Sequence, residues 1–294
     1  MGTVAIAELF LLAALWGGSF LWLRVAAPVL GPVWLIELRV VLASLVLLPL
    51  MVRFNLMAEM RRHWRDLLII GSLNSALPFL LFAFSALSLS AGFTAILNAT
   101  TPLFGTVIAA LWLREKMTIA SILGSMLGFI GVVVLVGWEP IPFTLNFGLA
   151  VLSGLLGALM YAIAAPYTKL RLSGVSSLVL TTGSQLGAAL LLLPALPFTI
   201  PQQTPSAFVI FSVLALAILS TSFAYVLYYR LIQNVGASKA LTIAYLVPPS
   251  ALLWGAIVLQ EPITLSMLIG CGLVLLGTAI ANGGVVPSAS SARS

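Results

Sequence analysis

The chain has very little charge, because only 7% of its 294 residues are Asp, Glu, Lys or Arg while 62% are apolar. Soluble domains carry about 25% charged residues, and the mean hydropathy of +1.20 also excludes an ordinary soluble enzyme. A single cysteine, Cys271, excludes an internal disulfide and a cysteine metal site. A single histidine, His63, leaves no histidine pair for zinc. We therefore expect an all-α integral membrane protein without cofactor or metal.

Long apolar runs, bounded by Pro, Gly or charged residues, divide the whole chain. A membrane-crossing helix needs about 20 mostly apolar residues. Ten such spans are predicted, which leaves short connections and no room for a soluble domain. The Ser- and Ala-rich segment 283–294 is predicted to be a disordered cytoplasmic tail. The spans cover roughly residues 4–26, 31–52, 66–87, 92–113, 118–137, 147–167, 175–196, 206–230, 236–259 and 264–282.

Basic residues lie mostly on one side of these predicted spans. The net charge of +6 would suggest nucleic acid in a soluble protein, but the basic residues are few and scattered, so we expect no nucleic-acid partner. Only Arg24 falls on the side opposite to the N-terminus. Because cytoplasmic loops are enriched in Lys and Arg, we predict a multi-pass protein of the bacterial inner membrane with both termini cytoplasmic. The basic residues on the N-terminal side are Arg53, Arg61, Arg62, Arg65, Arg114, Lys116, Lys169, Arg171, Arg230, Lys239 and Arg293.

The two halves of the chain match at an offset of 146 residues. Each half has five predicted spans, an odd number, so the second half must enter the membrane in the opposite orientation. We predict two inverted five-helix repeats, residues 1–143 and 144–282, with a substrate site near the midplane between them. The matching pairs are Phe79 and Tyr225, Phe82 and Tyr228, Pro102 and Pro248, Glu115 and Glu261, Thr118 and Thr264, Gly124 and Gly270, and Gly131 and Gly277.

Several motifs together resemble the drug/metabolite transporter superfamily, and within it the ten-helix exporters with two EamA-type repeats. The resemblance implies an exporter of small metabolites, with amino acids, including aromatic ones, as the best-known substrates of close relatives. It also implies a central cavity walled by the first, third, fourth, sixth, eighth and ninth spans, with the fifth and tenth at the periphery. Tyr161 departs from the family pattern, which often has Trp there. The motifs are residues 14–20 (ALWGGSF), Arg39, Pro102, Arg114-Glu115, Pro248, Gln260-Glu261-Pro262, Gly270 and Gly277.

Two asparagines in the predicted spans each precede a proline by four residues: Asn74 precedes Pro78, and Asn98 precedes Pro102. A proline removes the hydrogen bond to the carbonyl four residues earlier and kinks the helix. Each asparagine therefore combines a freed main-chain oxygen with its own amide. We predict that these turns bind the ammonium or the carboxylate of a zwitterion, and the alternative is a packing kink with an interhelical amide bond.

Aromatic rings in the spans of the predicted cavity are the second set of candidates. Such rings suit an apolar or aromatic substrate side chain and can also hold a cation over a ring face. The alternative for each ring is ordinary packing or lipid contact. Together with the two turns, the predicted substrate-binding residues are Trp16, Phe79, Phe82, Tyr161, Tyr225, Tyr245 and Pro248.

Charged residues within the spans are few. We expect Glu37 to pair with Arg24 across the short connection between the first two spans, with a proton-coupling site as the alternative. Glu115 and Glu261 are expected to stabilise the N-termini of the helices that follow them. The predicted cavity then contains no buried net charge, which suits neutral or zwitterionic cargo.

We predict an amino-acid exporter that works by alternating access in the lipid bilayer, as a monomer or weak homodimer, with a proton as candidate coupling ion. The alternative is efflux of lipophilic cations or drugs, or of another small metabolite. Cation efflux requires an acidic cavity residue, and only Glu8 and Glu37 are available. A membrane enzyme is disfavoured because the sequence offers no catalytic constellation. An ion channel is disfavoured because mid-span prolines favour rocking helices.

Overall fold

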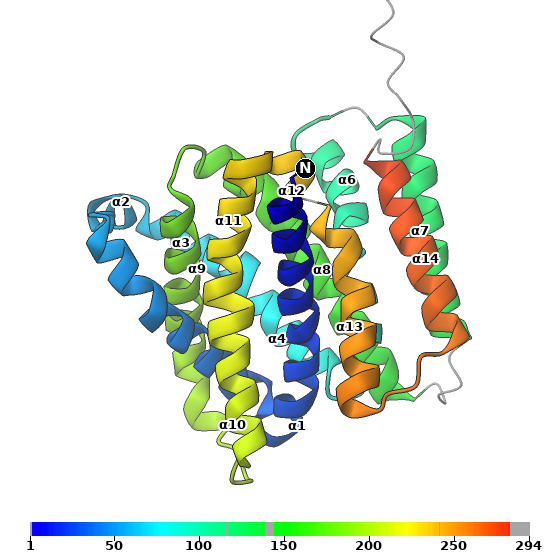
Figure 1. The fold of residues 1–294 in the computed structure, drawn as a ribbon, viewed down its shortest axis with the longest axis horizontal. Helices are drawn as coiled ribbons and strands as arrows, with labels where there is room; N and C mark the ends of the chain where they lie inside the picture. Colours follow the sequence, from blue (N-terminus) through cyan, green and yellow to red (C-terminus); the bar gives the residue numbers. More distant parts are fainter. Residues whose placement is uncertain (1, 116, 139–143, 241, 283–294) are drawn as a thin grey trace, which may run out of the picture.

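A computed structural model describes residues 2–115, 117–138, 144–240 and 242–282, and every regular element within them is a helix (Figure 1). Lys116, residues 139–143 between the predicted fifth and sixth spans, and the predicted tail at 283–294 lie outside the described residues. The first part of the chain forms α1 (Thr3–Arg53), α2 (Met57–Arg62), α3 (Trp64–Gly71), η1 (Ser72–Ala76), α4 (Leu77–Ser85), α5 (Ala91–Asn98), α6 (Thr101–Trp112) and α7 (Ile119–Gly137). The second part forms α8 (Leu145–Arg171), α9 (Ser177–Leu192), η2 (Leu193–Phe198), α10 (Ala207–Leu214), η3 (Ala215–Phe223), α11 (Ala224–Val235), α12 (Ala237–Ala240), α13 (Ile243–Leu259) and α14 (Leu265–Ala281).

The helices are those of a membrane protein. Among the described residues, seven helical stretches are long and apolar enough to cross a membrane, and the shorter α13 and α14 are also apolar. Large apolar side chains lie on the outer surface, and Ile119, Val133 and Leu145 are each more than two-thirds exposed. Lipid accepts such a surface, whereas a soluble protein rarely exposes one. The chain is therefore a multi-pass membrane protein.

α1 is 51 residues long and breaks in its middle. Gly31 has a φ of 73° and a ψ of 153°, which an L side chain rarely adopts and glycine adopts freely. Pro28 and Pro32 flank this glycine. The break lies at the predicted start of the second span, and the helix resumes at once without a loop.

Two of the helical stretches contain π-type turns. η1 joins α3 to α4, and η3 joins α10 to α11. Asn74 lies in η1, four residues before Pro78, and Ser220 lies in η3. π-turns inside α-helices occur frequently at functional sites because they redirect side chains locally.

α7 and α14 lie side by side at one edge of the bundle (Figure 1), as expected for the peripheral fifth and tenth spans. Glycines allow this close contact. A Cβ atom on Gly124 would lie 2.5 Å from the carbonyl oxygen of Gly277, and one on Gly270 would lie 2.9 Å from that of Gly131. The four glycines of the two matching pairs therefore pack crosswise within one chain, Gly124 against Gly277 and Gly131 against Gly270.

The N-termini of α7 and α14 are capped by threonines. Thr118 and Thr264 each accept a hydrogen bond from the backbone N–H three residues further on. The expectation that Glu115 and Glu261 stabilise these two helices is therefore wrong. Glu261 instead accepts a hydrogen bond of 2.9 Å from the backbone N–H of Ala91, at the start of α5.

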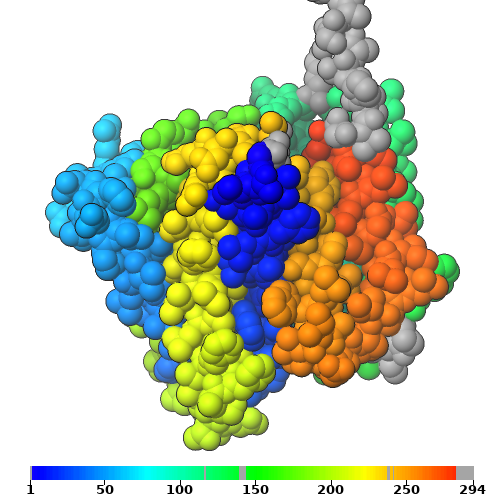
Figure 2. Space-filling view, viewed as in Figure 1, coloured from blue at the N-terminus to red at the C-terminus, as the bar shows by residue number. Residues whose placement is uncertain are grey.

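The first half of α1 lies between the α10–α11 stretch and α13 on one face of the molecule (Figure 2). The largest apolar core joins α1 to residues of α4, α9, α11 and α13. A second core cluster joins α5, α7, α8, α13 and α14. α1 thus packs one face into the core, and side chains on this face can reach a central cavity.

Candidate functional site

A cavity of about 380 Å³ lies in the middle of the bundle. Its walls come from both segments of α1, from η1 and α4, from the junction of α5 and α6, and from α8, η3, α11 and α13. These elements include all six predicted wall spans. The volume falls in the range of small-molecule sites. No Asp or Glu occurs among the described residues that line it.

Most of the residues predicted to bind substrate lie around this cavity. Pro78 is buried in α4 but is not among the lining residues, and Tyr245 lines a second cavity instead. Substrate contact stays a prediction for all eleven residues. The nine that line the cavity are Trp16, Asn74, Phe79, Phe82, Asn98, Pro102, Tyr161, Tyr225 and Pro248.

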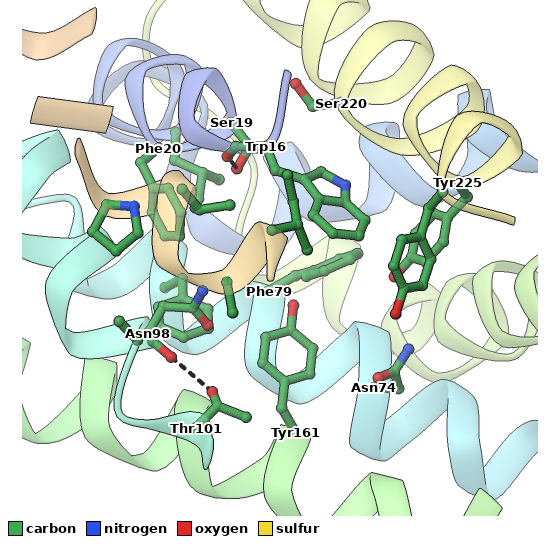
Figure 3. Close-up of a pocket in the computed structure, with 18 of the residues that line it drawn as sticks. Trp16, Ser19, Phe20, Asn74, Phe79, Asn98, Thr101, Tyr161, Ser220 and Tyr225 are labelled. Carbon is green, nitrogen blue, oxygen red and sulfur yellow. Dashed lines mark hydrogen bonds between the residues drawn. The ribbon is translucent and has the colours of Figure 1, made fainter. Parts of the chain in front are cut away.

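Aromatic rings form a large part of the cavity wall (Figure 3). Trp16 of α1 contacts Tyr225 and Tyr228 of α11, with ring centroids 6.0 and 5.1 Å apart. Phe82 of α4 stacks on Tyr161 of α8 at 5.9 Å. Such pairs prefer edge-on or offset contacts and hold one another in place. The wall is therefore apolar and ordered, with tyrosine hydroxyls as polar groups.

The two asparagines lie differently from each other. The hydroxyl of Tyr225 points toward Asn74 in Figure 3. The main-chain carbonyl of Asn98, predicted to be freed by Pro102, accepts a hydrogen bond of 2.8 Å from the hydroxyl of Thr101 and so already has one partner. The side-chain Oδ1 of Asn98 is buried and has no hydrogen-bond partner among the described residues. The amide of Asn98, rather than its carbonyl, remains the polar candidate at this turn.

Arg39 is the charged residue among the cavity-lining residues that the sequence analysis did not name as candidates. Its Nε donates a hydrogen bond of 2.9 Å to Thr221 in η3, and its guanidinium carbon lies 3.5 Å from the ring centroid of Phe79. The residue is 6% exposed, and no ion pair to it is found in the described part of the chain. The expected absence of buried net charge is therefore wrong. The available signal was an arginine within an apolar span, which is costly unless it has a function.

The second half of the chain contains a matching contact. Nε2 of Gln185 in α9 donates a hydrogen bond of 3.2 Å to Oγ of Ser75 in η1. The offset of the sequence repeat, 146 residues, relates Arg39 to Gln185 and also relates Ser75 to Thr221. Gln185 is fully buried and does not line the cavity. The same contact is thus made twice, once by a charged and once by a neutral side chain.

Arg24 forms an ion pair with Glu261, a residue of the connection between α13 and α14. This connection lies at the end of the bundle opposite to the N-terminus (Figure 1). Its Nε lies 3.4 Å from Oε1 of Glu261, and its Nη1 donates to the carbonyls of Ala86 and Leu87. Burial raises the pKa of the Glu261 carboxyl, while Arg24 and a backbone N–H favour the charged form. The expected pair between Arg24 and Glu37 is wrong, because Glu37 is buried with an unpartnered Oε2.

A second cavity, of about 720 Å³, adjoins the central one toward the other end of the bundle. The two cavities share Tyr161, Pro102, Thr101 and Ala244 as lining residues. Glu115 lines the second cavity and pairs with Lys169 at 3.2 Å. Both of these side chains are more than half exposed, unlike those of the pair at the opposite end.

The profile of the EamA-like transporter family matches residues 4–137 and 148–283. The chain is 28% identical over 272 residues to an uncharacterized transporter of Archaeoglobus fulgidus, covering 92% of this chain and 95% of that one. It is 25% identical over 266 residues to the uncharacterized transporter YoaV of Bacillus subtilis, covering 90% and 91%. A solved crystal structure with 18% identity matches with a TM-score of 0.66 over 96% of this chain and 97% of its own, which supports the fold. The relatives are transporters rather than enzymes, and the protein belongs to the EamA-like transporter family of the drug/metabolite transporter superfamily.

Proposed function

We propose that the protein exports amino acids, in particular neutral and aromatic ones, by alternating access around the central cavity. The observation that carries this proposal is the chemistry of the cavity wall. It combines aromatic rings with two asparagine amides and has no acidic side chain among its described lining residues. Rings accommodate an apolar side chain, and the amides supply donors and acceptors to the charged groups of a zwitterion.

The same wall argues against lipophilic cations as cargo. A buried cation needs a nearby carboxylate to offset its desolvation. Glu8 is paired with Arg230 at 2.9 Å, and neither Glu8 nor Glu37 lines the cavity. A cavity that contains Arg39 and no carboxylate repels positive charge.

Ten membrane crossings in two inverted five-helix repeats, residues 1–143 and 144–282, are part of the proposal. The two segments of α1 on either side of Gly31 would each cross once. Support comes from the contacts of Arg39 and Gln185, which are related by the repeat offset. Both termini would be cytoplasmic in a bacterial inner membrane, because the basic residues gather on that side. Since the whole cavity lies within one chain, we expect a monomer, with a weak homodimer as the alternative.

In alternating access, the cavity would open first at one end of the bundle and then at the other. The central cavity continues into the second one on the N-terminal side, which is the cytoplasmic side in this orientation. At the other end, Arg24 and Glu261 tie α1 to the α13–α14 connection. We propose that this pair holds the outer end closed.

Coupling to protons is proposed at Glu37. The residue is 5% exposed and has no ion pair among the described residues, so its protonation would remove a buried charge. In liposomes, an imposed pH gradient should stimulate uptake by the unmodified protein and not by Glu37→Gln. Equal stimulation of both proteins would exclude Glu37 as the coupling site.

The proposed cargo is tested by reconstitution. The pure protein in liposomes should take up labelled threonine, methionine or phenylalanine above protein-free liposomes. Uptake that saturates and is competed by other amino acids would support the proposal. No uptake of any amino acid, together with transport of a cationic dye, would favour drug efflux.

A further inference from the structure

We propose that Arg39 is the carboxylate-binding residue of the central cavity. Its terminal nitrogens would hold both oxygens of a substrate carboxylate, which for the proposed cargo is the α-carboxylate of an amino acid. This inference rests on the proposed function for the identity of the cargo. The binding of a carboxylate to Arg39 can be tested independently of that identity.

Arg39 is a buried charge that has no counter-charge among the described residues. Its only hydrogen bond in the described structure goes from Nε to Thr221, and the terminal Nη1 and Nη2 atoms have none. A buried ion without a partner is strongly unfavourable, so such a residue is expected to be paired at some stage of its work. Arg39 lines the cavity, where a ligand can supply that partner.

Two contacts fix the plane of the guanidinium group. Thr221 accepts from Nε at 2.9 Å on one edge, and the ring of Phe79 lies 3.5 Å from the guanidinium carbon on one face. These contacts leave the opposite edge, which carries Nη1 and Nη2, for another group. A planar fork of two N–H donors matches a carboxylate and forms two parallel charge-assisted hydrogen bonds.

The surroundings of Arg39 suit a carboxylate attached to an apolar body. Phe79 belongs to the same aromatic wall, and Tyr161 and Tyr225 lie close enough to interact electrostatically with the guanidinium. The orphan Oδ1 of Asn98 is a polar acceptor in the same cavity and can receive an ammonium proton. Phosphorylated cargo is less well matched, because no second basic side chain lines the described cavity.

The matching position in the second half shows that the fold itself does not need the charge. Gln185 makes the equivalent hydrogen bond to Ser75 with a neutral amide, and it does not face the cavity. Arg39→Gln therefore imports a side chain that this fold already uses in the same contact. A role of Arg39 in stability alone would not explain a cation at this place.

The test measures ligand binding to the purified full-length protein by calorimetry, with three probes that share one apolar body. Phenylalanine has both charged groups, phenylalaninamide lacks the carboxylate, and 3-phenylpropionate lacks the ammonium. The unmodified protein should bind phenylalaninamide roughly 10- to 100-fold more weakly than phenylalanine, because a charge-assisted contact is lost. Arg39→Gln should weaken the binding of phenylalanine and of 3-phenylpropionate by a similar factor, and it should not weaken the binding of phenylalaninamide. Arg39→Lys should have an intermediate effect, because it keeps the charge and loses the fork.

Gln185→Leu is the matched control and should keep the carboxylate preference. Equal binding of phenylalanine and phenylalaninamide by the unmodified protein would overturn the inference and leave the proposed function standing. Binding of 3-phenylpropionate but of no amino acid would uphold the inference and overturn the proposed function. Failure of the unmodified protein to bind any carboxylate probe would overturn the inference. If Arg39→Gln does not fold, Arg39→Lys decides, and full retention of phenylalanine affinity in that variant would count against the fork.

Discussion

Arg39 and Gln185 lie at matching positions of the two halves and make matching hydrogen bonds, of 2.9 Å to Thr221 and 3.2 Å to Ser75. The first side chain is charged and faces the cavity, and the second is neutral and does not. Because both contacts occur in the same fold, the hydrogen bond serves the packing of the helices. The positive charge, which only the first half has at this position, is then available to bind the cargo.

The two ends of the bundle differ in a similar way. The side chains of Arg24 and Glu261 are 32% and 15% exposed, whereas those of Lys169 and Glu115 are 69% and 54% exposed. Exposed ion pairs contribute little because water screens them. The difference indicates that one end is tied together while the other end is loosely held.

The largest effect is expected from Asn98→Leu. The matching residue in the second half is Ala244, so the amide is present on one side only. Because Oδ1 of Asn98 has no partner, its removal breaks no side-chain hydrogen bond among the described residues. We expect transport to fall to background while the amount of folded protein, followed by size-exclusion chromatography, stays the same. Normal export by this variant would exclude Asn98 from the substrate site.

A destabilisation of about 1–3 kcal/mol is expected from Gly277→Val, because the new side chain overlaps the backbone of α7. Gly124→Val should lower the unfolding free energy by a similar amount, because Gly124 and Gly277 lie against each other. Gly272→Val is the control, because nothing lies within 4 Å of a Cβ atom there. Thermal unfolding in detergent measures all three, and a midpoint for Gly272→Val as low as that for Gly277→Val would contradict the packing account.

A smaller loss, of about 1 kcal/mol, is expected from Gln185→Leu, because the hydrogen bond to Ser75 disappears. Transport per folded molecule should not change. This outcome is the reverse of that expected for Arg39→Gln, which should impair transport without lowering stability. Loss of transport in both variants, measured in the same liposomes, would remove the functional difference between the two halves.

The smallest effects on stability concern the ion pairs. Lys169→Gln should change the unfolding free energy by less than about 0.5 kcal/mol, because its pair is exposed.

Arg24→Gln should instead make the cavity accessible from the outer side, because the pair with Glu261 is lost. With Cys271 replaced by Ala and Ser220 replaced by Cys, a membrane-impermeant thiol reagent should label from the outer side faster after Arg24→Gln. An unchanged labelling rate would argue against this pair as the outer closure.

The spans and the aromatic wall could be predicted because long apolar runs and ring positions are visible along the chain. Trp16, Phe82 and Pro248 line the cavity as the span assignment implies. The orientation of a side chain around an apolar helix is not visible in this way, because no polar face marks the inward direction. Tyr245 therefore lines the neighbouring cavity, although its span is a wall of the central one.

Side-chain pairs across the bundle could not be predicted from the sequence either. Arg24 and Glu37 are close in the chain, but Arg24 instead meets Glu261, which is far away in sequence. The break at Gly31 and the tertiary packing decide which carboxylate lies near an arginine. In the same way, the contact of Arg39 with Thr221 could not be predicted from the sequence. The correspondence between this contact and that of Gln185 with Ser75 is recognised only once both contacts are known.

The most direct test of the account is a counterflow measurement in proteoliposomes. Vesicles loaded with unlabelled phenylalanine are diluted into a trace of labelled phenylalanine, and the label inside is followed over time. A carrier that alternates around one amino-acid site predicts a transient accumulation of label above its equilibrium level, absent from protein-free vesicles. Entry of label at a rate that does not depend on the unlabelled phenylalanine inside, or no entry at all, would contradict the account.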